Sequence, residues 1–176
     1  MRYSYTMSKI ILVAHNIRST HNVGSLLRTA DCLGVDIVYL TGYTPYPIYE
    51  NDQRLPHISN KLDAQIHKTA LGAERTVKWL HAPEISNTIK TLRMSGIQVV
   101  ALEQAKGSIA LPQFSSTQNI AIIVGNEVTG LDASVLDMVD SIVEIPMSGA
   151  KESLNVAQAS AICLYHLRFI NISQKG

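Results

Sequence analysis

The sequence predicts an α/β protein with a mostly parallel sheet flanked by helices. Short apolar runs alternate along the chain with segments whose apolar residues recur at helical spacing. Most of the runs show no alternation of polar and apolar residues, which is typical of strands covered on both faces of a sheet. With 176 residues, 46% of them hydrophobic, the chain can bury a sizeable core, and we expect one domain over residues 1–176.

Six apolar runs are predicted to be strands, one of them weaker than the rest. In chain order they are Ile10–Ala14, Ile37–Leu40, the weaker Thr76–Leu80, Val99–Leu102, Ile120–Val124 and Ile142–Ile145. Helices are expected between and after them, at about 21–33, 61–71, 84–95, 131–139 and 153–170. The segment Gly42–Asn60 contains three prolines and no periodicity, so it is predicted to be a long loop, and such loops often bind ligands.

Charge and composition set limits on the class of protein. The net charge of +1 gives no overall basic field, so any nucleic-acid binding would need a local basic patch. Cys32 and Cys163 both stand among apolar neighbours, and we expect buried free thiols. The first apolar run, Ile10–Ala14, is too short for a signal peptide or a membrane span, and we expect a cytoplasmic protein.

The common nucleotide and hydrolase motifs are missing. No GxGxxG follows the first strand, and there is no GxxxxGK[ST], CxxC, HExxH or GxSxG anywhere in the chain. His15 and His21 lie near one another but make a weak case for a metal, and none is expected. The ligand of a parallel sheet lies at the carboxyl ends of its strands, so the polar loops there are the remaining candidates.

The loop after the first strand leads into a helix that begins with small and amide-bearing residues. Arg28 lies opposite the apolar stripe of this helix, with Asn22 and Thr29 near it. An exposed helix arginine is usually a solvated residue. Small residues at a helix N-terminus, however, favour anion binding, and an arginine one or two turns further could hold a phosphate or ribose.

Two later loops carry the same kind of polar residue. In the run Gly125–Gly130, Glu127 is either a carboxylate that stabilises a helix start or part of a site beside two glycines. After Pro146, Ser153 is placed to cap a helix beginning near Leu154. Asn155 lies in the first turn of an apolar helix, where a buried amide needs hydrogen-bond partners.

Together these loops resemble the three signature motifs of the SpoU (TrmH) family of RNA ribose 2′-O-methyltransferases, within the SPOUT superfamily. The segment from Asn22 to Arg28-Thr29 is similar to the first motif, and Gly125–Gly130 is similar to the second. Ile145-Pro146-Met147 followed by Ser153-Leu154-Asn155 is similar to the third. The resemblance runs from about residue 10 to 168, and all three motifs occur in order after predicted strands.

The resemblance implies properties that periodicity does not reveal. It implies a deep C-terminal trefoil knot, S-adenosylmethionine as cofactor, and a homodimer whose active site uses residues of both chains. The implied catalytic residues are Arg28, Asn22, Glu127, Ser153 and Asn155. The implied cofactor contacts, many of them through the backbone, are Leu102, Glu103, Gly125, Ile145, Met147 and Leu154.

The implied reaction methylates a ribose 2′-hydroxyl in tRNA or rRNA, with the methyl group taken from the cofactor sulfonium. Arg28 would act either as the base, although a guanidinium deprotonates reluctantly, or only as an anchor for phosphate and alkoxide. We expect no N-terminal RNA-binding extension, so the core, the 42–60 loop or the dimer surface would select the RNA. The main alternative is a non-catalytic RNA-binding or ribosome-assembly module. Among enzymes, a SPOUT relative that methylates a base nitrogen is the closest alternative, although the first motif favours ribose over base. An oxidoreductase is less favoured because the Gly-rich fingerprint is missing.

Overall fold

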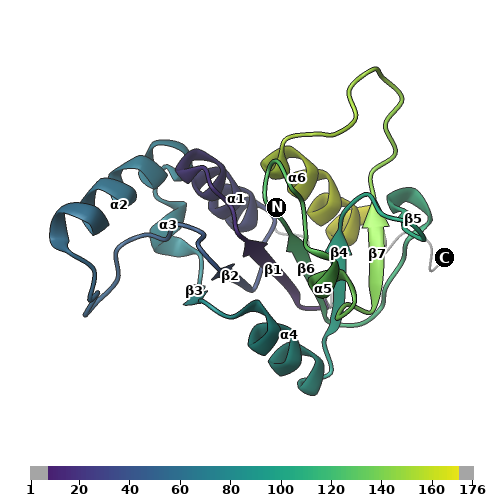
Figure 1. Cartoon of the computed structure of the whole chain (residues 1–176), viewed down its shortest axis with the longest axis horizontal. Coiled ribbons are helices and arrows are strands. Elements are labelled where there is room, and N and C mark those ends of the chain that lie inside the picture. The colour runs from purple at the N-terminus through teal and green to yellow at the C-terminus, as the bar shows by residue number, and fades with distance from the viewer. Residues whose placement is uncertain (1–7, 171–176) are drawn as a thin grey trace.

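Seven strands form one sheet in the order β3-β2-β1-β6-β4-β7-β5, with parallel pairing throughout (Figure 1). The computed structural model describes residues 8–170. The strands are β1 (Ile10–His15), β2 (Ile37–Thr41), β3 (Trp79–Ala82), β4 (Gln98–Leu102), β5 (Ile109–Ala110), β6 (Ile120–Val124) and β7 (Ser141–Glu144).

Helices connect these strands and cover both faces of the sheet. They are α1 (Thr20–Cys32), α2 (Pro56–Ala70), α3 (Ala73–Thr76), α4 (Ile85–Met94), α5 (Ala133–Leu136) and α6 (Val156–Tyr165). A short 3-10 turn, Leu111–Gln113, follows β5, and a π-helical turn, His166–Ile170, continues α6. The predicted α/β class with a parallel sheet is confirmed.

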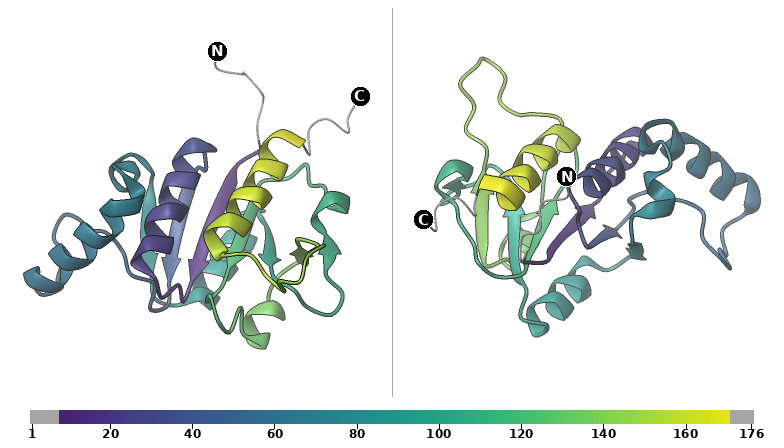
Figure 2. Two further views of the ribbon diagram at one scale, coloured as in Figure 1. Left: turned by 90° about the horizontal axis from the view of Figure 1, so that it is seen from above. Right: turned by 180° about the vertical axis from the view of Figure 1, so that it is seen from behind.

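The two faces of the sheet carry two separate apolar clusters. On one face, Leu12 and Ala14 of β1 pack in a cluster that includes residues of α1, α2, α3 and α6. On the other face, Ile11 and Val13 pack in a cluster that includes residues of α4 and α5. This alternation follows from the period of two in a strand, and it explains why both faces of β1 are apolar. α1 and α6 lie side by side on the first face, with α2 beyond α1 (Figure 2).

Several predicted boundaries differ from the structure. The predicted loop 42–60 ends at residue 55, because Pro56 occupies the first position of α2, where its missing N–H is harmless. The weak strand predicted at Thr76–Leu80 is displaced: Thr76 ends α3, and β3 begins at Trp79. β5 escapes prediction because two residues leave no apolar run to detect.

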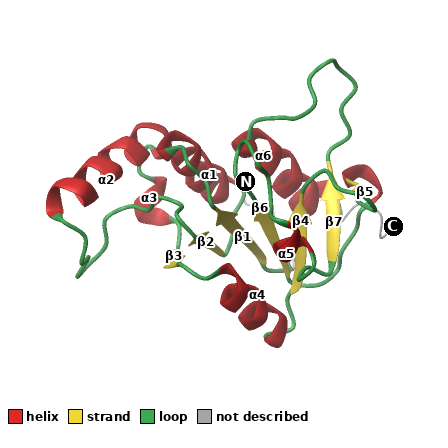
Figure 3. Cartoon of the chain, viewed as in Figure 1, coloured by secondary structure: helices red, strands yellow, loops and turns green. Residues whose placement is uncertain are grey.

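The last helix also starts later than predicted. α6 begins at Val156 rather than at residue 153, and the segment between β7 and α6 is an extended loop that projects beyond the sheet (Figure 3). No helix in residues 8–170 is long and apolar enough to cross a membrane. The apolar run Ile10–Ala14, which was judged too short for a signal peptide or a membrane span, lies in β1. Residues 1–7 lie outside the described part of the chain.

The two cysteines are free but differ in burial. Cys163 is buried in α6, and this burial raises the pKa of its thiol to about 12. Cys32 is exposed, so the expectation of a buried thiol is wrong there. It stands two positions after the buried Ala30, and two helical steps rotate a side chain by about 200° to the outer face of α1.

Candidate functional site

The candidate site lies where the direction of winding of the sheet reverses. β1 and β6 are neighbours, yet α1, which follows β1, covers one face, and α5, which follows β6, covers the other. The loops after these two strands therefore diverge and leave a crevice at their carboxyl ends, where open α/β sheets bind ligands. The segments 16–22 and 125–131 border this crevice.

Glu127 joins the two loops of the crevice. Its Oε2 accepts a hydrogen bond from the backbone N–H of Arg18 at 3.0 Å. Its Oε1 accepts from the backbone N–H of Ser19 at 3.1 Å and from Nδ2 of Asn22 at 2.8 Å. The carboxylate is thus held by the residues at the start of α1.

The environment of Glu127 favours its charged form. Partial burial by itself would raise the pKa of the carboxyl group, but the hydrogen bonds from Arg18, Asn22 and Ser19 outweigh it, and the pKa lies below its ordinary value. Glu127 is therefore ionised at neutral pH. A carboxylate with this pKa is suited to orienting donors and is poorly suited to taking a proton.

Asn155 brings the third loop into the same cluster. Its Nδ2 donates to Oδ1 of Asn22 at 3.1 Å, so Asn22 is bonded on both sides, to Asn155 and to Glu127. Its Oδ1 accepts from the backbone N–H of Ala157 at 2.9 Å, which makes Asn155 the N-cap of α6. The capping role assigned to Ser153 is wrong. Ser153 lies two residues before the N-cap Asn155 and forms no hydrogen bond within residues 8–170.

A cavity of about 480 Å³ opens beside this cluster. Its lining includes all six predicted cofactor contacts, Leu102, Glu103, Gly125, Ile145, Met147 and Leu154, together with Glu127, Ser153 and Asn155. The structure thus brings nine of the eleven predicted site residues to one cavity. Asn22 joins them through its hydrogen bonds, whereas Arg28 does not.

Two glycines and Glu103 give the cavity its walls. A Cβ atom at Gly125 would lie 2.7 Å from the backbone of Gly130, so no side chain fits there. Gly130 has φ +68, and a Cβ atom there would collide with the carboxylate of Glu103. That carboxylate accepts from the backbone N–H of Leu131 at 3.0 Å. Glu103 therefore holds the loop that follows β6.

A further bond closes the cavity from the side of β7. Nε2 of Gln104 donates to the backbone oxygen of Glu152 at 2.8 Å. The loops after β4, β6 and β7 are thus fastened to one another, although they are far apart in the sequence.

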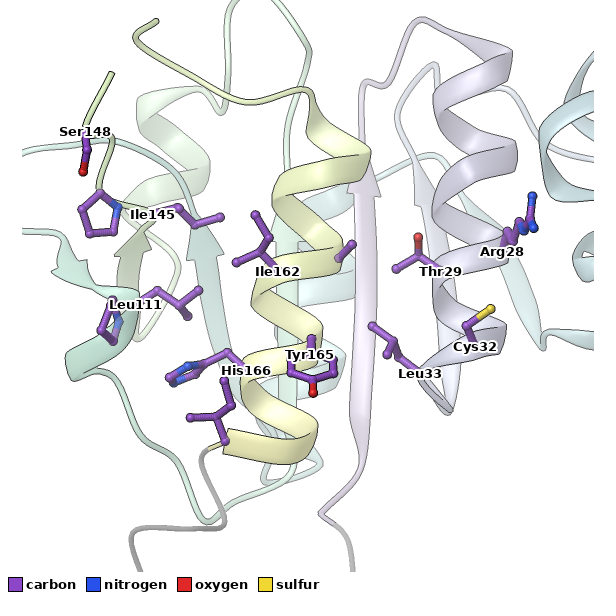
Figure 4. A pocket seen from close by; sticks show the side chains of 14 residues that line it. Arg28, Thr29, Cys32, Leu33, Leu111, Ile145, Ser148, Ile162, Tyr165 and His166 are labelled. Atoms are coloured by element: carbon purple, nitrogen blue, oxygen red, sulfur yellow. The ribbon is translucent and has the colours of Figure 1, made fainter. Parts of the chain in front are cut away.

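Arg28 lies apart from this cavity. It borders a different, mostly apolar cavity of about 830 Å³ on the outer face of α1 and α6, together with Thr29, Ile162 and Tyr165 (Figure 4). Arg28 extends from the side of α1 remote from α6, whereas Thr29 points toward α6. Within residues 8–170 no hydrogen bond or ion pair holds its exposed guanidinium. In one chain, then, Arg28 and Glu127 belong to different surfaces.

Two residues at the crevice escaped the sequence analysis. Asn126 is only 8% exposed, and its Nδ2 donates to the hydroxyl of Tyr43 at 2.8 Å and to the backbone oxygen of Asn16 at 3.1 Å. Asn16 has φ 56, an uncommon conformation outside glycine. Asn126 could have been identified from the sequence, because it is an amide next to Glu127 within the second motif. Nothing in the sequence marks Tyr43 as functional except its position in the predicted long loop.

The histidines give no metal site in the described part of the chain. Nδ1 of His15 lies 2.9 Å from the hydroxyl of Thr41, and burial lowers the pKa of His15, which keeps the ring neutral. Residues 8–170 contain no group of three or more His, Cys, Asp or Glu side chains that could hold a metal ion.

Sequence comparison matches the chain to one family over most of its length. Residues 9–165 match the family described as "SpoU rRNA Methylase family". A 23S rRNA (guanosine-2'-O-)-methyltransferase RlmB from Bordetella pertussis is 31% identical over 156 residues, which are 89% of this chain and 58% of the relative. A tRNA (guanosine(18)-2'-O)-methyltransferase from Aquifex aeolicus is 27% identical over 159 residues, 89% of this chain and 67% of the relative.

Solved structures share the fold. The SpoU methyltransferase AviRb from Streptomyces viridochromogenes, in complex with AdoMet, aligns with a TM-score of 0.77 at 24% identity, over 96% of this chain and 63% of that one. A structure described as "Structural insights into the 2-OH methylation of C/U34 on tRNA" aligns with a TM-score of 0.76 at 21% identity, over 96% of this chain and 99% of that one. The chain spans less than two thirds of the length of the RlmB relatives. It belongs to the SpoU rRNA methylase family.

Proposed function

We propose that this protein transfers a methyl group from S-adenosylmethionine to a ribose 2′-hydroxyl in RNA. The observation that carries the proposal is the junction of all three motif loops through Glu127, Asn22 and Asn155, beside the 480 Å³ cavity. The named activities of the RlmB and tRNA relatives support the same reaction class.

The residues around the cavity fit an adenosyl cofactor. The volume lies in the range of small-ligand pockets, and Leu102, Ile145, Met147 and Leu154 offer apolar contact for a base. A side chain at Gly125 would collide with Gly130 and Leu131, so glycine lets the loop after β6 pack closely at the cavity wall. We assign these residues, with Glu103 as the brace of the loop after β6, to the cofactor site. S-adenosylmethionine, when bound, supplies an electrophilic methyl group.

The protein's own task is alignment and help with one proton. The ionised Glu127 fixes the side chain of Asn22, and Asn22 in turn binds Asn155. We assign these three residues to the orientation of the ribose. Ser153 has an exposed hydroxyl that no bond within residues 8–170 engages, so it is available to the substrate.

Arg28 needs a second copy of the chain to reach such a site. The outer face of α1 and α6 is apolar and exposed: Ile162 is 44% exposed and Tyr165 is 51% exposed, beside the ring of Phe169. We propose that this face pairs with itself in a homodimer and that Arg28 enters the partner's crevice. A two-fold interface would do this for both sites at once.

The deep trefoil knot also remains a proposal. Its support is the fastening of three distant loops, through the bonds from Leu131 to Glu103 and from Gln104 to Glu152, at the point where the family resemblance puts the threading. We propose further that residues 1–176 form a single SPOUT methyltransferase domain. Because the proposed substrate is tRNA or rRNA, we also propose that the protein acts in the cytoplasm.

The decisive experiment uses the purified protein, methyl-labelled S-adenosylmethionine, and unmodified tRNA and rRNA transcripts in separate reactions. Nucleoside digestion of the labelled RNA should give a 2′-O-methylated nucleoside from one of the two. A labelled base would instead indicate the base-methylating alternative. Cofactor binding without transfer to either RNA would favour a non-catalytic RNA-binding or ribosome-assembly module.

A further inference from the structure

The side chain of Tyr43 crosses the carboxyl edge of the sheet. Tyr43 follows β2, and its hydroxyl accepts a hydrogen bond from Asn126, which follows β6. β1 lies between these two strands. Since neighbouring strands are about 4.8 Å apart, the tyrosine reaches over the end of β1 to the turn that carries Glu127.

The hydroxyl of Tyr43 is held by a residue that cannot move freely. Oδ1 of Asn126 accepts from the backbone N–H groups of Val128 and Thr129, at 2.8 and 3.0 Å. Its Nδ2 is shared between Tyr43 and the backbone of Asn16. The amide is thus fully used in a nearly buried position, which fixes the direction of the phenol.

The backbone of Tyr43 is fixed as well. Its N–H donates to Oδ1 of Asn16 at 3.2 Å. The preceding Gly42 has φ +66, and a Cβ atom there would collide with the side chain of Asn16. Tyr43 is therefore held at its backbone by Asn16 and at its hydroxyl by Asn126.

Although both ends of the residue are tied, its aromatic ring is not covered. Tyr43 is 61% exposed, and the turn that its hydroxyl contacts through Asn126 also holds, through Glu127, the backbone of the exposed Arg18. A large ring held rigidly in solvent loses no further freedom when it is covered. An aromatic face of this kind suits an unpaired RNA base, because every base can stack on it and single-stranded RNA is recognised in this way.

We infer that Tyr43 stacks against an unpaired base of the RNA and so positions the ribose before Glu127 and Asn22. The inference rests on the proposed function for the identity of the ligand. Tyr43 is then a positioning residue for substrate. It belongs to the loop that the sequence singles out for its prolines, and no motif includes it.

The first test measures binding without chemistry. A short single-stranded oligoribonucleotide containing 2-aminopurine is titrated with the full chain, because the fluorescence of this base falls when it stacks. We expect Tyr43→Ala to weaken binding about fivefold to a hundredfold and to lessen the quenching. Tyr43→Phe, which retains the ring, should stay within about threefold of the wild type.

A matched control comes from the same loop. Tyr49 is 47% exposed, but its ring packs near Trp79 at the start of β3, with centroids 6.3 Å apart, away from the carboxyl edge. Tyr49→Ala should bind the oligonucleotide as the wild type does. Equal losses in Tyr49→Ala and Tyr43→Ala would overturn the inference.

The second test separates substrate positioning from structural support. In methyl transfer to the RNA that the wild type accepts, Tyr43→Ala should raise KM for RNA and leave the Kd of S-adenosylmethionine unchanged. Equal losses in Tyr43→Ala and Tyr43→Phe, with a lowered Tm in both, would mean that only the bond to Asn126 matters and would overturn the inference. A wild type that transfers no methyl group would refute the proposed function, whereas the quenching measurement would still decide the role of Tyr43.

Discussion

Two surfaces of this protein carry its candidate catalytic residues. They differ in how many hydrogen bonds those residues form within one chain. In the crevice, the side chains of Glu127, Asn22 and Asn155 bond to one another and to backbone groups. On the outer face of α1 and α6, Arg28 has no such bond within residues 8–170, and the apolar side chains around it are exposed. The hydrogen bonds of the crevice form within one chain, whereas the outer face of α1 and α6 is the surface for which we propose pairing with a second copy.

The largest effect is expected on the second surface. Arg28→Ala should lower kcat about a hundredfold to a thousandfold, the usual cost of removing one group that stabilises developing charge. Arg28→Lys should be nearly as poor, because an ammonium does not reproduce the planar guanidinium. Tm should not change, since the side chain makes no bond within the described chain. If Arg28 anchors phosphate, the Kd for RNA will rise in Arg28→Ala; if it is the base, that Kd will stay constant.

A charged substitution on the outer face of α1 and α6 should remove activity by preventing the proposed dimer from forming. Ile162→Glu places a charge on an apolar surface, so we expect monomers in analytical ultracentrifugation and little methyl transfer. A mixture of Arg28→Ala and Glu127→Ala proteins should recover about a quarter of wild-type activity, because half of the dimers are mixed and each holds one intact site. No recovery from this mixture would mean that Arg28 and Glu127 act within one chain.

A smaller effect is expected from the crevice. Glu127→Ala should lower kcat more than it weakens S-adenosylmethionine binding, because Glu127 binds Asn22 and, in the proposed site, orients it toward the ribose. Each lost hydrogen bond should cost about 1 kcal/mol of stability. Unchanged turnover in the purified variant would contradict the assignment.

The stability contributed by Glu127 should depend on pH. Its pKa is lowered in the folded protein relative to the ordinary value of 4.5, so its contribution is complete above that pH and is lost as pH falls through the folded pKa. The difference in unfolding free energy between the wild type and Glu127→Gln should therefore shrink as the pH is lowered below 4.5. Urea unfolding at several pH values measures it. A difference that does not change with pH would argue against an ionised, hydrogen-bonded carboxylate.

The smallest effect separates the two roles of Asn155. Asn155→Ala removes both the cap of α6 and the donor to Asn22, and should cost about 1 kcal/mol together with turnover. Asn155→Asp retains a capping oxygen but no donor, so stability should be nearly restored while turnover stays low. Ser153→Ala serves as the control for stability, because Ser153 does not cap the helix. A clear loss of Tm in Ser153→Ala would reverse this distinction.

The sequence predicted most elements because their physical signals are local. Apolar runs such as Ile120–Val124 identify buried parallel strands, and the confirmed helices have clear periodicity. The predicted boundaries were wrong where a contact in space decides them. At the start of α6, the side-chain Oδ1 of Asn155 accepts from the backbone N–H of Ala157, and the hydroxyl of Ser153 plays no part in the cap. β5 was not predicted, because two residues are too few to show a hydrophobic pattern. The burial of Cys32 was predicted wrongly, because its neighbours in sequence are not its neighbours in space.

By itself, the sequence determined the α/β class, the parallel sheet and the three polar loops after strands, because these depend on hydrophobic period and residue type. Only the tertiary structure decided which of the polar residues meet. It joined Asn22 to Glu127 and to Asn155, each more than a hundred positions away in the sequence, and it put Arg28 on another surface. It also exposed the fixed ring of Tyr43 beside them. Hydrogen bonds depend on distances in space, and the order of residues along a chain does not contain those distances.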